Sequence, residues 1–303
     1  MNKVTILLST YNGEKYLEEQ LNSLFLQKKV DFNILARDDG STDNTLKILN
    51  NYKNNYLNFN YYLGKNIGPC KSFLDLICKS GDSDYYAFCD QDDVWDDDKL
   101  IIAIKMLKEL DNSKPLLYHS NLRVTDKNLN FIRLSHIKYR EQKNKYSALI
   151  ENLATGCTVV FNRKAKEYII NKIPDYCIMH DYWLYLVCKF FGETIYDFEP
   201  HLDYRQHEKN TIGTYCKKNI SYLEKIFNNL KKYKEEKYIE NAKNFYKVFS
   251  NLFSSKDKEI ILSFINLKQS FSSRIKLFFN RDIHTSSKIN EISYRLALIA
   301  NIL

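Results

Sequence analysis

Four short apolar runs recur along the first hundred residues of the chain. They cover residues 4–9 (VTILLS), 32–36 (FNILA), 59–63 (FNYYL) and 85–89 (YYAFC), and their length is typical of buried strands. Between the first two runs, Leu17, Leu21, Leu24 and Phe25 recur at the spacing of one helix face. Strands that alternate with helices form βαβ units and parallel sheets. The pattern therefore predicts an α/β fold, with a Rossmann-like, mostly parallel sheet flanked by helices.

Polar residues follow each run, at the edge where parallel sheets bind their ligands. They are Thr10, Tyr11, Asn12, Gly13 and Glu14 after the first run, Asp38, Asp39 and Gly40 after the second, Lys65, Asn66 and Gly68 after the third, and residues 90–93 after the fourth. The carboxyl ends of parallel strands meet at one edge of a sheet. We therefore expect a single site built from all four groups, with Asp38 and Gly40 shaping a turn.

Six aspartates lie close together in the segment AFCDQDDVWDDDKL, residues 87–100. Asp90 and Asp92 follow the fourth run directly and, being two positions apart, are expected to project from the same face. Two carboxylates at a strand end suit Mg²⁺ or Mn²⁺, which prefer oxygen ligands. Three of the remaining aspartates, residues 96–98, are expected to cap and charge a helix over residues 99–110.

The last third of the chain differs in charge from the rest. From residue 215 onward there are 17 Lys and Arg against 8 Asp and Glu, a balance of +9, whereas the whole chain carries +8. Residues 220–238 and 260–279 mix apolar residues with Lys at helical spacing and contain no proline, which predicts amphipathic helices. We therefore expect one domain over residues 1–214 and a basic, α-helical C-terminal region over residues 215–303.

Two interpretations of this basic region stay open. Clustered Lys beside apolar helix faces would suit peripheral contact with an anionic membrane surface. Alternatively, the helices form a subdomain on the rest of the chain or a homodimer interface, with the Lys side chains merely solvated. Nucleic acid is not favoured as a partner, because the basic residues follow no recognisable nucleic-acid motif.

Composition favours a cytoplasmic protein. The chain has 303 residues and is 44% hydrophobic, enough for a large core. Its seven cysteines include no CxxC pair, so neither a disulfide framework nor a zinc ribbon is expected. We see no basic, apolar leader at the N-terminus and no run of about 18 apolar residues, and therefore expect neither a signal peptide nor a spanning helix.

Seven segments together carry a family resemblance. They are LLSTYNGEKYLEEQLNSL, ARDDGSTDNT, GKNIGPCKSF, CDQDDVW, TGCTVVFNR, HDYW and YRQHEKN, in this order. They resemble the motifs of family 2 glycosyltransferases with the GT-A fold, over about the first 214 residues. Within that family, DQDDVW and YRQH most resemble bacterial rhamnosyltransferases that build capsule or O-antigen chains.

The resemblance implies transfer of a sugar from a nucleoside-diphosphate donor, a dTDP- or UDP-sugar, to a saccharide or polyprenyl-linked acceptor. Residues 1–95 would form the nucleotide-sugar half and residues 96–214 the acceptor half. In the first half Thr10 and Tyr11 would line the base pocket, with their backbone reading the pyrimidine edge. Asp39 would accept a hydrogen bond from the pyrimidine imide or the ribose. The other expected donor-binding residues are Asn12, Glu14, Asn66, Gly68, Asp90, Gln91, Asp92 and Arg205.

Simpler roles for some of these residues stay open. Tyr11 would also serve as a buried aromatic, and Asp39 as a turn residue. Gly68 precedes Pro69, and this pair would also occur in an ordinary loop without a binding role. Arg205 would offer a fork to phosphate or would pair with a nearby acidic residue.

The resemblance also assigns the metal and the catalytic base. His207 would join Asp92 and Asp90 in holding Mn²⁺ or Mg²⁺. Asp181 would take the proton of the acceptor hydroxyl, which makes the transfer inverting, although an Asp there would also serve as the N-cap of a helix over residues 181–191. The residues expected on the acceptor side are Gly156, His180, Tyr182 and Trp183, with core packing as the alternative for Trp183.

Two other functions use similar residues. A nucleotidyltransferase that makes the activated sugar would also need a metal at the sheet edge. It would be expected to show a Gly-rich phosphate loop after the first strand, where STYNGEKY has one glycine. The non-enzymatic alternative is a catalytically inactive binding protein on a membrane surface, which the intact aspartates argue against.

Overall fold

The computed structural model describes residues 2–135, 144–208, 221–233 and 236–301. Their contacts divide the chain into two compact units. The first comprises Met1–Ile137, Ala154–Asn171 and Met179–Thr214, and the second Lys138–Leu153, Lys172–Ile178 and Tyr215–Leu303. Two segments inside the expected 1–214 domain, residues 144–153 and 172–178, thus belong with the C-terminal helices. The expected boundary between residues 214 and 215 lies outside the described residues.

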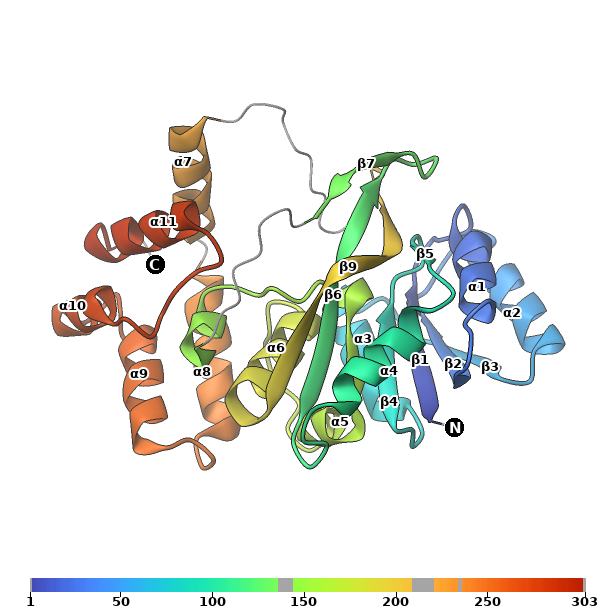
Figure 1. The fold of residues 1–303 in the computed structure, drawn as a ribbon, viewed down its shortest axis with the longest axis horizontal. Helices are drawn as coiled ribbons and strands as arrows, with labels where there is room; N and C mark the ends of the chain where they lie inside the picture. The colour runs from blue at the N-terminus through green and yellow to red at the C-terminus, as the bar shows by residue number, and fades with distance from the viewer. Residues whose placement is uncertain (1, 136–143, 209–220, 234–235, 302–303) are drawn as a thin grey trace. The chain divides into compact units, whose positions relative to one another are not determined.

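The first unit is built on a nine-stranded sheet with the order β3-β2-β1-β4-β8-β6-β9-β5, and β7 pairs with β6 (Figure 1). The strands are β1 (Lys3–Thr10), β2 (Asp31–Asp38), β3 (Phe59–Leu63), β4 (Tyr85–Cys89), β5 (Val94–Trp95), β6 (Leu116–Thr125), β7 (Phe131–Leu134), β8 (Val160–Asn162) and β9 (Glu193–Arg205). The first four strands coincide with the four apolar runs to within two residues at either end. All pairings among them are parallel, so their carboxyl ends share one edge.

The second half of the sheet is mixed. Strand β8 runs antiparallel to both β4 and β6, whereas the two long strands β6 and β9 pair in parallel. Strand β5 adds antiparallel to β9, with Val94 opposite Asp203. This pairing brings the segment after β4 beside the end of β9, although the two are more than 100 residues apart in sequence.

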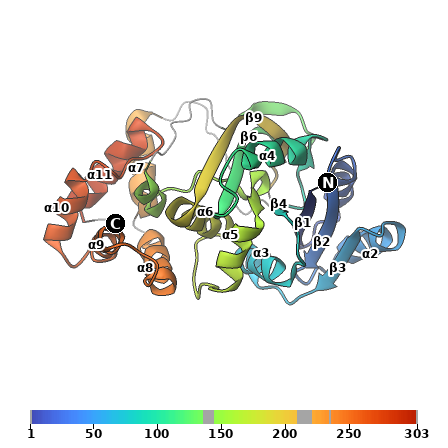
Figure 2. The same cartoon turned by 60° about the horizontal axis from the view of Figure 1, so that its bottom comes forward.

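Helices cover both faces of the sheet (Figure 2). They are α1 (Leu17–Phe25), α2 (Thr45–Asn55), α3 (Gly68–Lys79), α4 (Lys99–Lys108), α5 (Arg163–Ile170) and α6 (His180–Phe191). Val4, Ile6 and Leu8, alternate residues of β1, share one core with α1, α2 and α4. The predicted stripe of α1 lies in that core, where Leu17, Leu21 and Leu24 are fully buried. Helices α3, α5 and α6 contact one another and lie together in both views.

The second unit contains helices α7 (Tyr222–Tyr233), α8 (Lys237–Phe249), α9 (Ser255–Ile265), α10 (Phe271–Phe279) and α11 (Lys288–Ile299). Its core includes Phe245, Phe249, Phe264 and Tyr294. The prediction of one helix over residues 260–279 was wrong, because α9 ends at Ile265 and the Ser270 side chain caps the separate helix α10. The predicted helix over 220–238 corresponds to α7 and the start of α8, and residues 220 and 234–235 lie outside the described part. No helix in the described residues is both long and apolar enough to cross a bilayer.

Candidate active site

The loop after β1 is held by hydrogen bonds from four successive backbone N–H groups. Tyr11 donates to Gln91 Oε1 (2.8 Å), Asn12 to Ser41 Oγ (2.8 Å), Gly13 to Thr45 Oγ1 (2.8 Å) and Glu14 to Asp43 Oδ2 (3.1 Å). Side chains therefore already occupy the N–H groups that a phosphate-binding loop would direct at its ligand. This arrangement argues against the nucleotidyltransferase alternative.

The segment after β2 forms the predicted turn. The Asp38 carboxylate accepts from the N–H groups of Gly40 (3.1 Å) and Ser41 (2.8 Å), and from the Thr10 hydroxyl (3.1 Å). Gly40 has a φ of 87°, which favours glycine. Thr10 is buried, so its hydroxyl organises this turn instead of facing a ligand. The structure also buries less of Tyr11 than the core alternative requires, since the residue is 47% exposed.

Asp39 is tied to the start of α3 and to a buried arginine. Its Oδ2 accepts from the N–H groups of Ile67 and Gly68, both at 3.0 Å, and its Oδ1 pairs with Arg37. Arg37 itself also donates to Asp75 Oδ2 (3.0 Å) and to a backbone carbonyl. The three bonds leave Asp39 with acceptor capacity for one more donor, because a carboxylate offers about four lone-pair sites. Asn66, beside this turn, is exposed.

The aspartates after β4 divide into two neighbouring groups. Asp92 Oδ2 lies 2.7 Å from His207 Nε2, which is hydrogen-bond distance. Asp90 instead groups with Asp93 and Cys157, whose ligand atoms lie within 4.8 Å of one another. Burial and the neighbouring Asp92 carboxylate raise the pKa of Asp90 to about 7 and that of Asp93 well above its ordinary value. The environment thus disfavours several negative charges together unless a cation is present.

Asp93 was expected at this edge of the sheet, but no role of its own was predicted from the sequence. It is fully buried, and its Oδ1 accepts from the Arg205 N–H (3.2 Å), whereas its Oδ2 has no hydrogen-bond partner among the described residues. A buried carboxylate oxygen without a partner is costly. Together with the Asp90 carboxylate, which lies within 4.8 Å, this oxygen has the donor chemistry that suits a hard divalent cation.

Lys99 was missed, because at the start of a helix it reads as a surface residue. The side chain is fully buried, donates to the Cys157 carbonyl (2.6 Å) and lies over the Trp95 ring. Burial lowers the pKa of Lys99 to about 8, against the raising effect of nearby Cys and Asp side chains. The Lys99 ammonium thus lies near Asp90 and Asp93. It also joins α4 to the segment that carries Gly156.

The Arg205 guanidinium is not available for bidentate binding of phosphate. It is buried, pairs with Glu19, and donates to the carbonyls of Asp92 (2.9 Å) and Lys127 (2.8 Å). The alternative role, pairing with an acidic residue, is the one that the structure shows. Arg205 fixes the backbone that carries Asp92.

The capping roles assigned to residues 96–98 were mostly wrong. Asp98 precedes α4 but makes no side-chain capping bond. Asp96 pairs with Arg123 at 2.5 Å, and Asp97 with Lys28. The cations Arg123 and Lys28 lie within reach of these two carboxylates, which pair with them instead of capping α4.

Asp181 lies at the second position of α6, and Met179 is the N-cap residue. The expected N-cap role of Asp181 was therefore wrong. The carboxyl is buried, which raises its pKa to about 7, and the N–H groups of Tyr182 and Gly156 oppose this rise. Its charge also raises the pKa of Asp90, so the candidate base and the aspartates belong to one site. A pKa near 7 suits a general base.

The expected acceptor-side aromatic residues are core residues in this structure. Trp183 and Tyr182 are at most 3% exposed, so neither ring offers a free face to a sugar, and the core alternative for Trp183 is confirmed. His180 stacks on Phe73 at a centroid distance of 4.0 Å and contacts the edge of Phe88. Burial lowers the pKa of His180 to about 3, so the ring is neutral and acts by packing.

Gly156 lies close to two of its neighbours on α6. A Cβ at this position would lie 3.1 Å from His180 Nε2 and 3.4 Å from Asp181 Oδ2. The backbone of residues 156–158 therefore approaches the Asp181 carboxyl more closely than a larger residue would allow.

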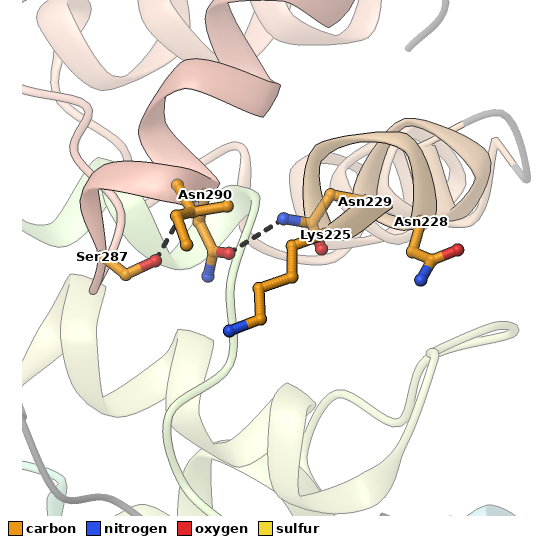
Figure 3. A pocket seen from close by; sticks show the side chains of 6 residues that line it. Lys225, Asn228, Asn229, Ser287 and Asn290 are labelled. Atoms are coloured by element: carbon orange, nitrogen blue, oxygen red, sulfur yellow. Dashed lines mark hydrogen bonds between the residues drawn. The ribbon is translucent and has the colours of Figure 1, made fainter. Parts of the chain in front are cut away.

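A separate pocket of about 350 Å³ lies in the second unit (Figure 3). It is lined by Lys225, Asn228, Asn229, Ser287, Ile289 and Asn290, and Asn229 donates to Asn290 there at 2.9 Å. None of the residues predicted for catalysis lines it.

Comparisons with known proteins identify related sequences and structures. The model of the family described as glycosyl transferase family 2 matches residues 5–169. A dTDP-rhamnosyl transferase of Shigella flexneri is 35% identical over 236 residues, which are 72% of this chain and 76% of that protein. A poly(ribitol-phosphate) β-N-acetylglucosaminyltransferase of Staphylococcus aureus, TarS, is 35% identical over 36% of this chain and 19% of its own length.

Solved structures show the same fold. TarS residues 1–349 in complex with UDP-GlcNAc superimpose with a TM-score of 0.58 at 16% identity, over 99% of this chain and 91% of that one. A mannosyltransferase of Pyrobaculum calidifontis, in complex with GDP-mannose and Mn²⁺, gives a TM-score of 0.51 at 13% identity, over 100% and 76%. These likenesses confirm the predicted GT-A fold. With more than half of its length matched by the family model, the chain belongs to glycosyl transferase family 2.

Proposed function

We propose that this glycosyltransferase is inverting and metal-dependent and transfers rhamnose or another hexose from a dTDP- or UDP-sugar. The acceptor would be a saccharide or polyprenyl-linked chain of a growing surface polysaccharide such as capsule or O-antigen. The identity of 35% to a dTDP-rhamnosyl transferase, over 72% of the chain, supports the donor. The proposed chemistry rests on one observation: four carboxyl groups and one imidazole lie close together at one edge of the sheet. They belong to Asp90, Asp92, Asp93, Asp181 and His207.

The buried cations of this edge are already committed to protein acceptors. Arg37 pairs with Asp39, Arg205 with Glu19, and Lys99 with a carbonyl. The loop after β1 likewise has no free N–H between Tyr11 and Glu14. Mn²⁺ or Mg²⁺ held by Asp92 and His207, with Asp90 and Asp93 nearby, would neutralise the departing diphosphate as a Lewis acid.

Asp181 would accept the proton of the acceptor hydroxyl. A carboxyl with a pKa of about 7 is partly ionised at neutral pH and still basic enough to take a proton. A base and a leaving group on opposite sides of the sugar carbon produce a single displacement, which inverts the anomeric configuration. Asp39 would use its remaining acceptor capacity for the donor's pyrimidine or ribose.

We also propose that the enzyme works in the cytoplasm at the inner face of the membrane. The second unit exposes large apolar residues on α7, α10 and α11, namely Leu223, Phe227, Phe271, Ile275, Phe279, Ile292, Leu296 and Ile299. Such residues combined with a basic surface suit an anionic lipid layer.

The decisive experiment is donor hydrolysis and transfer with a panel of nucleotide sugars, including dTDP-rhamnose and UDP-hexoses, with and without Mn²⁺. We expect one donor to be used, activity to disappear in excess EDTA, and the Asp92→Ala variant to be inactive, because the barrier rises by several kcal/mol. Full activity in EDTA would contradict metal dependence. A product that keeps the donor's anomeric configuration in NMR spectra would contradict the role of Asp181.

A further inference from the structure

Gln91, between the two aspartates Asp90 and Asp92, pairs with the backbone of Tyr11 just after the end of another strand. Its Oε1 accepts from the Tyr11 N–H at 2.8 Å, and its Nε2 donates to the Tyr11 carbonyl at 3.0 Å. Both distances are those of good hydrogen bonds. The carboxamide thus joins the segment after β4 to the loop after β1 at two points.

Gly13 leaves the room that this pair needs. A Cβ on Gly13 would lie 2.2 Å from Gln91 Oε1 and 2.6 Å from its Cδ, so the carboxamide would have to move. Backbone conformation does not explain the glycine, since the described glycines with positive φ are Gly40 and Gly68. The Gln91 carboxamide in this position therefore leaves no room for a Cβ at position 13.

The pair also changes the expected role of Tyr11. Its N–H and carbonyl were expected to read the pyrimidine edge, and the Gln91 carboxamide occupies both. The remaining N–H groups of the loop, from Asn12 to Glu14, are bound to side chains of residues 41–45. Gln91 thus links a loop anchored to the turn after β2, which carries Asp39, to the segment that carries Asp92.

We propose that Gln91 is a positioning residue that holds the base-binding side of the site at a fixed separation from the metal-binding aspartates. This inference rests on the proposed function, because it takes the donor to be a nucleoside diphosphate held at both ends. Attachment at two points strengthens binding only when the two points are correctly spaced. Without the Gln91 pair, each half of the site would stay intact, but the two halves would no longer be held in register.

The test uses Gln91→Ala, Gly13→Ala and the double variant of the full chain. UDP and dTDP are titrated calorimetrically in the presence of Mn²⁺, and KM and kcat are measured for the donor identified above. We expect Gln91→Ala to raise Kd and KM about tenfold, with a smaller change in kcat. Gly13→Ala should have a similar effect, because its methyl group displaces the carboxamide. The double variant should be no weaker than either single variant, since both remove the same pair.

Matched measurements separate positioning from general damage. Mn²⁺ affinity without nucleotide should stay within about twofold of wild type, and Gly81→Ala, where a Cβ meets nothing within 4 Å, should change neither Kd nor KM. Additive losses in the double variant would overturn the proposal. An unchanged Kd would overturn it as well, whether or not the melting temperature falls. A wild-type chain that binds neither nucleotide would instead overturn the proposed function.

Discussion

Asp181 is the residue whose protonation controls the expected chemistry. Burial raises its pKa to about 7, and only the ionised form accepts a proton. We therefore expect kcat to fall tenfold per pH unit below about pH 7 and to level off above it. Asp181→Asn should lower kcat by about 10² or more while nucleotide affinity stays nearly unchanged. A pH–rate profile of both proteins, with Kd from calorimetry, checks this expectation, and a flat profile from pH 5 to 8 would contradict it.

The same carboxyl also predicts an effect on stability. Folded Asp181 keeps a proton that the unfolded chain, with a pKa of 3.8, releases on the way to pH 7. The free energy of unfolding therefore falls as pH rises from about 4 to 7. Asp181→Asn removes this loss and should stabilise the protein by on the order of 1 kcal/mol at pH 8, but not at pH 4. Urea unfolding at the two pH values measures the difference, and an Asn variant less stable at pH 8 would contradict it.

At the residue scale, the sequence predicted the position of the site better than it predicted which side chains contact one another. Asp92 and His207 lie together as expected, although they are 115 residues apart. The roles of Asp93 and Lys99 were missed because burial decides them, and no spacing rule shows that a helix-start Lys faces inward. Arg205 was misassigned because its partner Glu19 lies on a distant helix.

At the element scale, Arg37 connects the end of β2 with α3 and with the loop after β3. The guanidinium is buried and bonds Asp39, Asp75 and the Lys65 carbonyl. A Cβ on Gly64 would lie 2.2 Å from its Nη2 and 2.5 Å from its Cζ. The buried Arg37 guanidinium is held by three acceptors and cannot move away easily. The loop after β3, which carries Gly64, therefore packs directly against the end of β2 through this close contact.

Gly64→Ala should therefore destabilise the protein by about 2 kcal/mol and raise the nucleotide Kd, because Asp39 loses its support. Gly81→Ala is the matched control, with no atom within 4 Å of its Cβ, and should be neutral. Urea unfolding and nucleotide titration provide the two readouts. If both variants behave alike, the contact between Gly64 and Arg37 has no such role.

The elements themselves were largely predictable in the first half of the chain. Each of the first four strands was identified from its apolar run, because buried parallel strands have continuous apolar sequence. The ends of the helices in the second unit were not, because serine caps interrupt an otherwise continuous amphipathic pattern, as Ser270 does before α10. Local capping chemistry outweighed the helical spacing there.

At the scale of the whole molecule, the second unit carries the basic excess and a large exposed apolar surface. On α10, Phe271, Ile275 and Phe279 recur every four residues and are 68%, 44% and 72% exposed. Lys231 and Lys232 on α7 are exposed as well. A soluble helix usually turns such apolar residues inward, and the proposed membrane contact would bury these residues of α10.

Replacing Phe271, Ile275 and Phe279 with Ser should reduce sedimentation with anionic liposomes at least tenfold, because apolar insertion is lost.

Lys231→Glu with Lys232→Glu should weaken binding at low salt more than at high salt, each charge contributing on the order of 1 kcal/mol near the surface. Hydrolysis of the soluble donor should stay unchanged in both variants. Leu57→Ser, a fully exposed leucine of the first unit, is the control. A shift from dimer to monomer with liposome binding unchanged would favour the homodimer interpretation.

The bonded loop after β1 has a consequence for the exchange of its amide hydrogens with solvent. Surface loops normally exchange within seconds, but the amides from Tyr11 to Glu14 each donate to a side chain from elsewhere in the sequence. Four adjacent surface amides should therefore exchange only when the turn after β2 or the segment after β4 opens as well. Their slow exchange would mark this loop as a part of the site that is already ordered before any donor arrives.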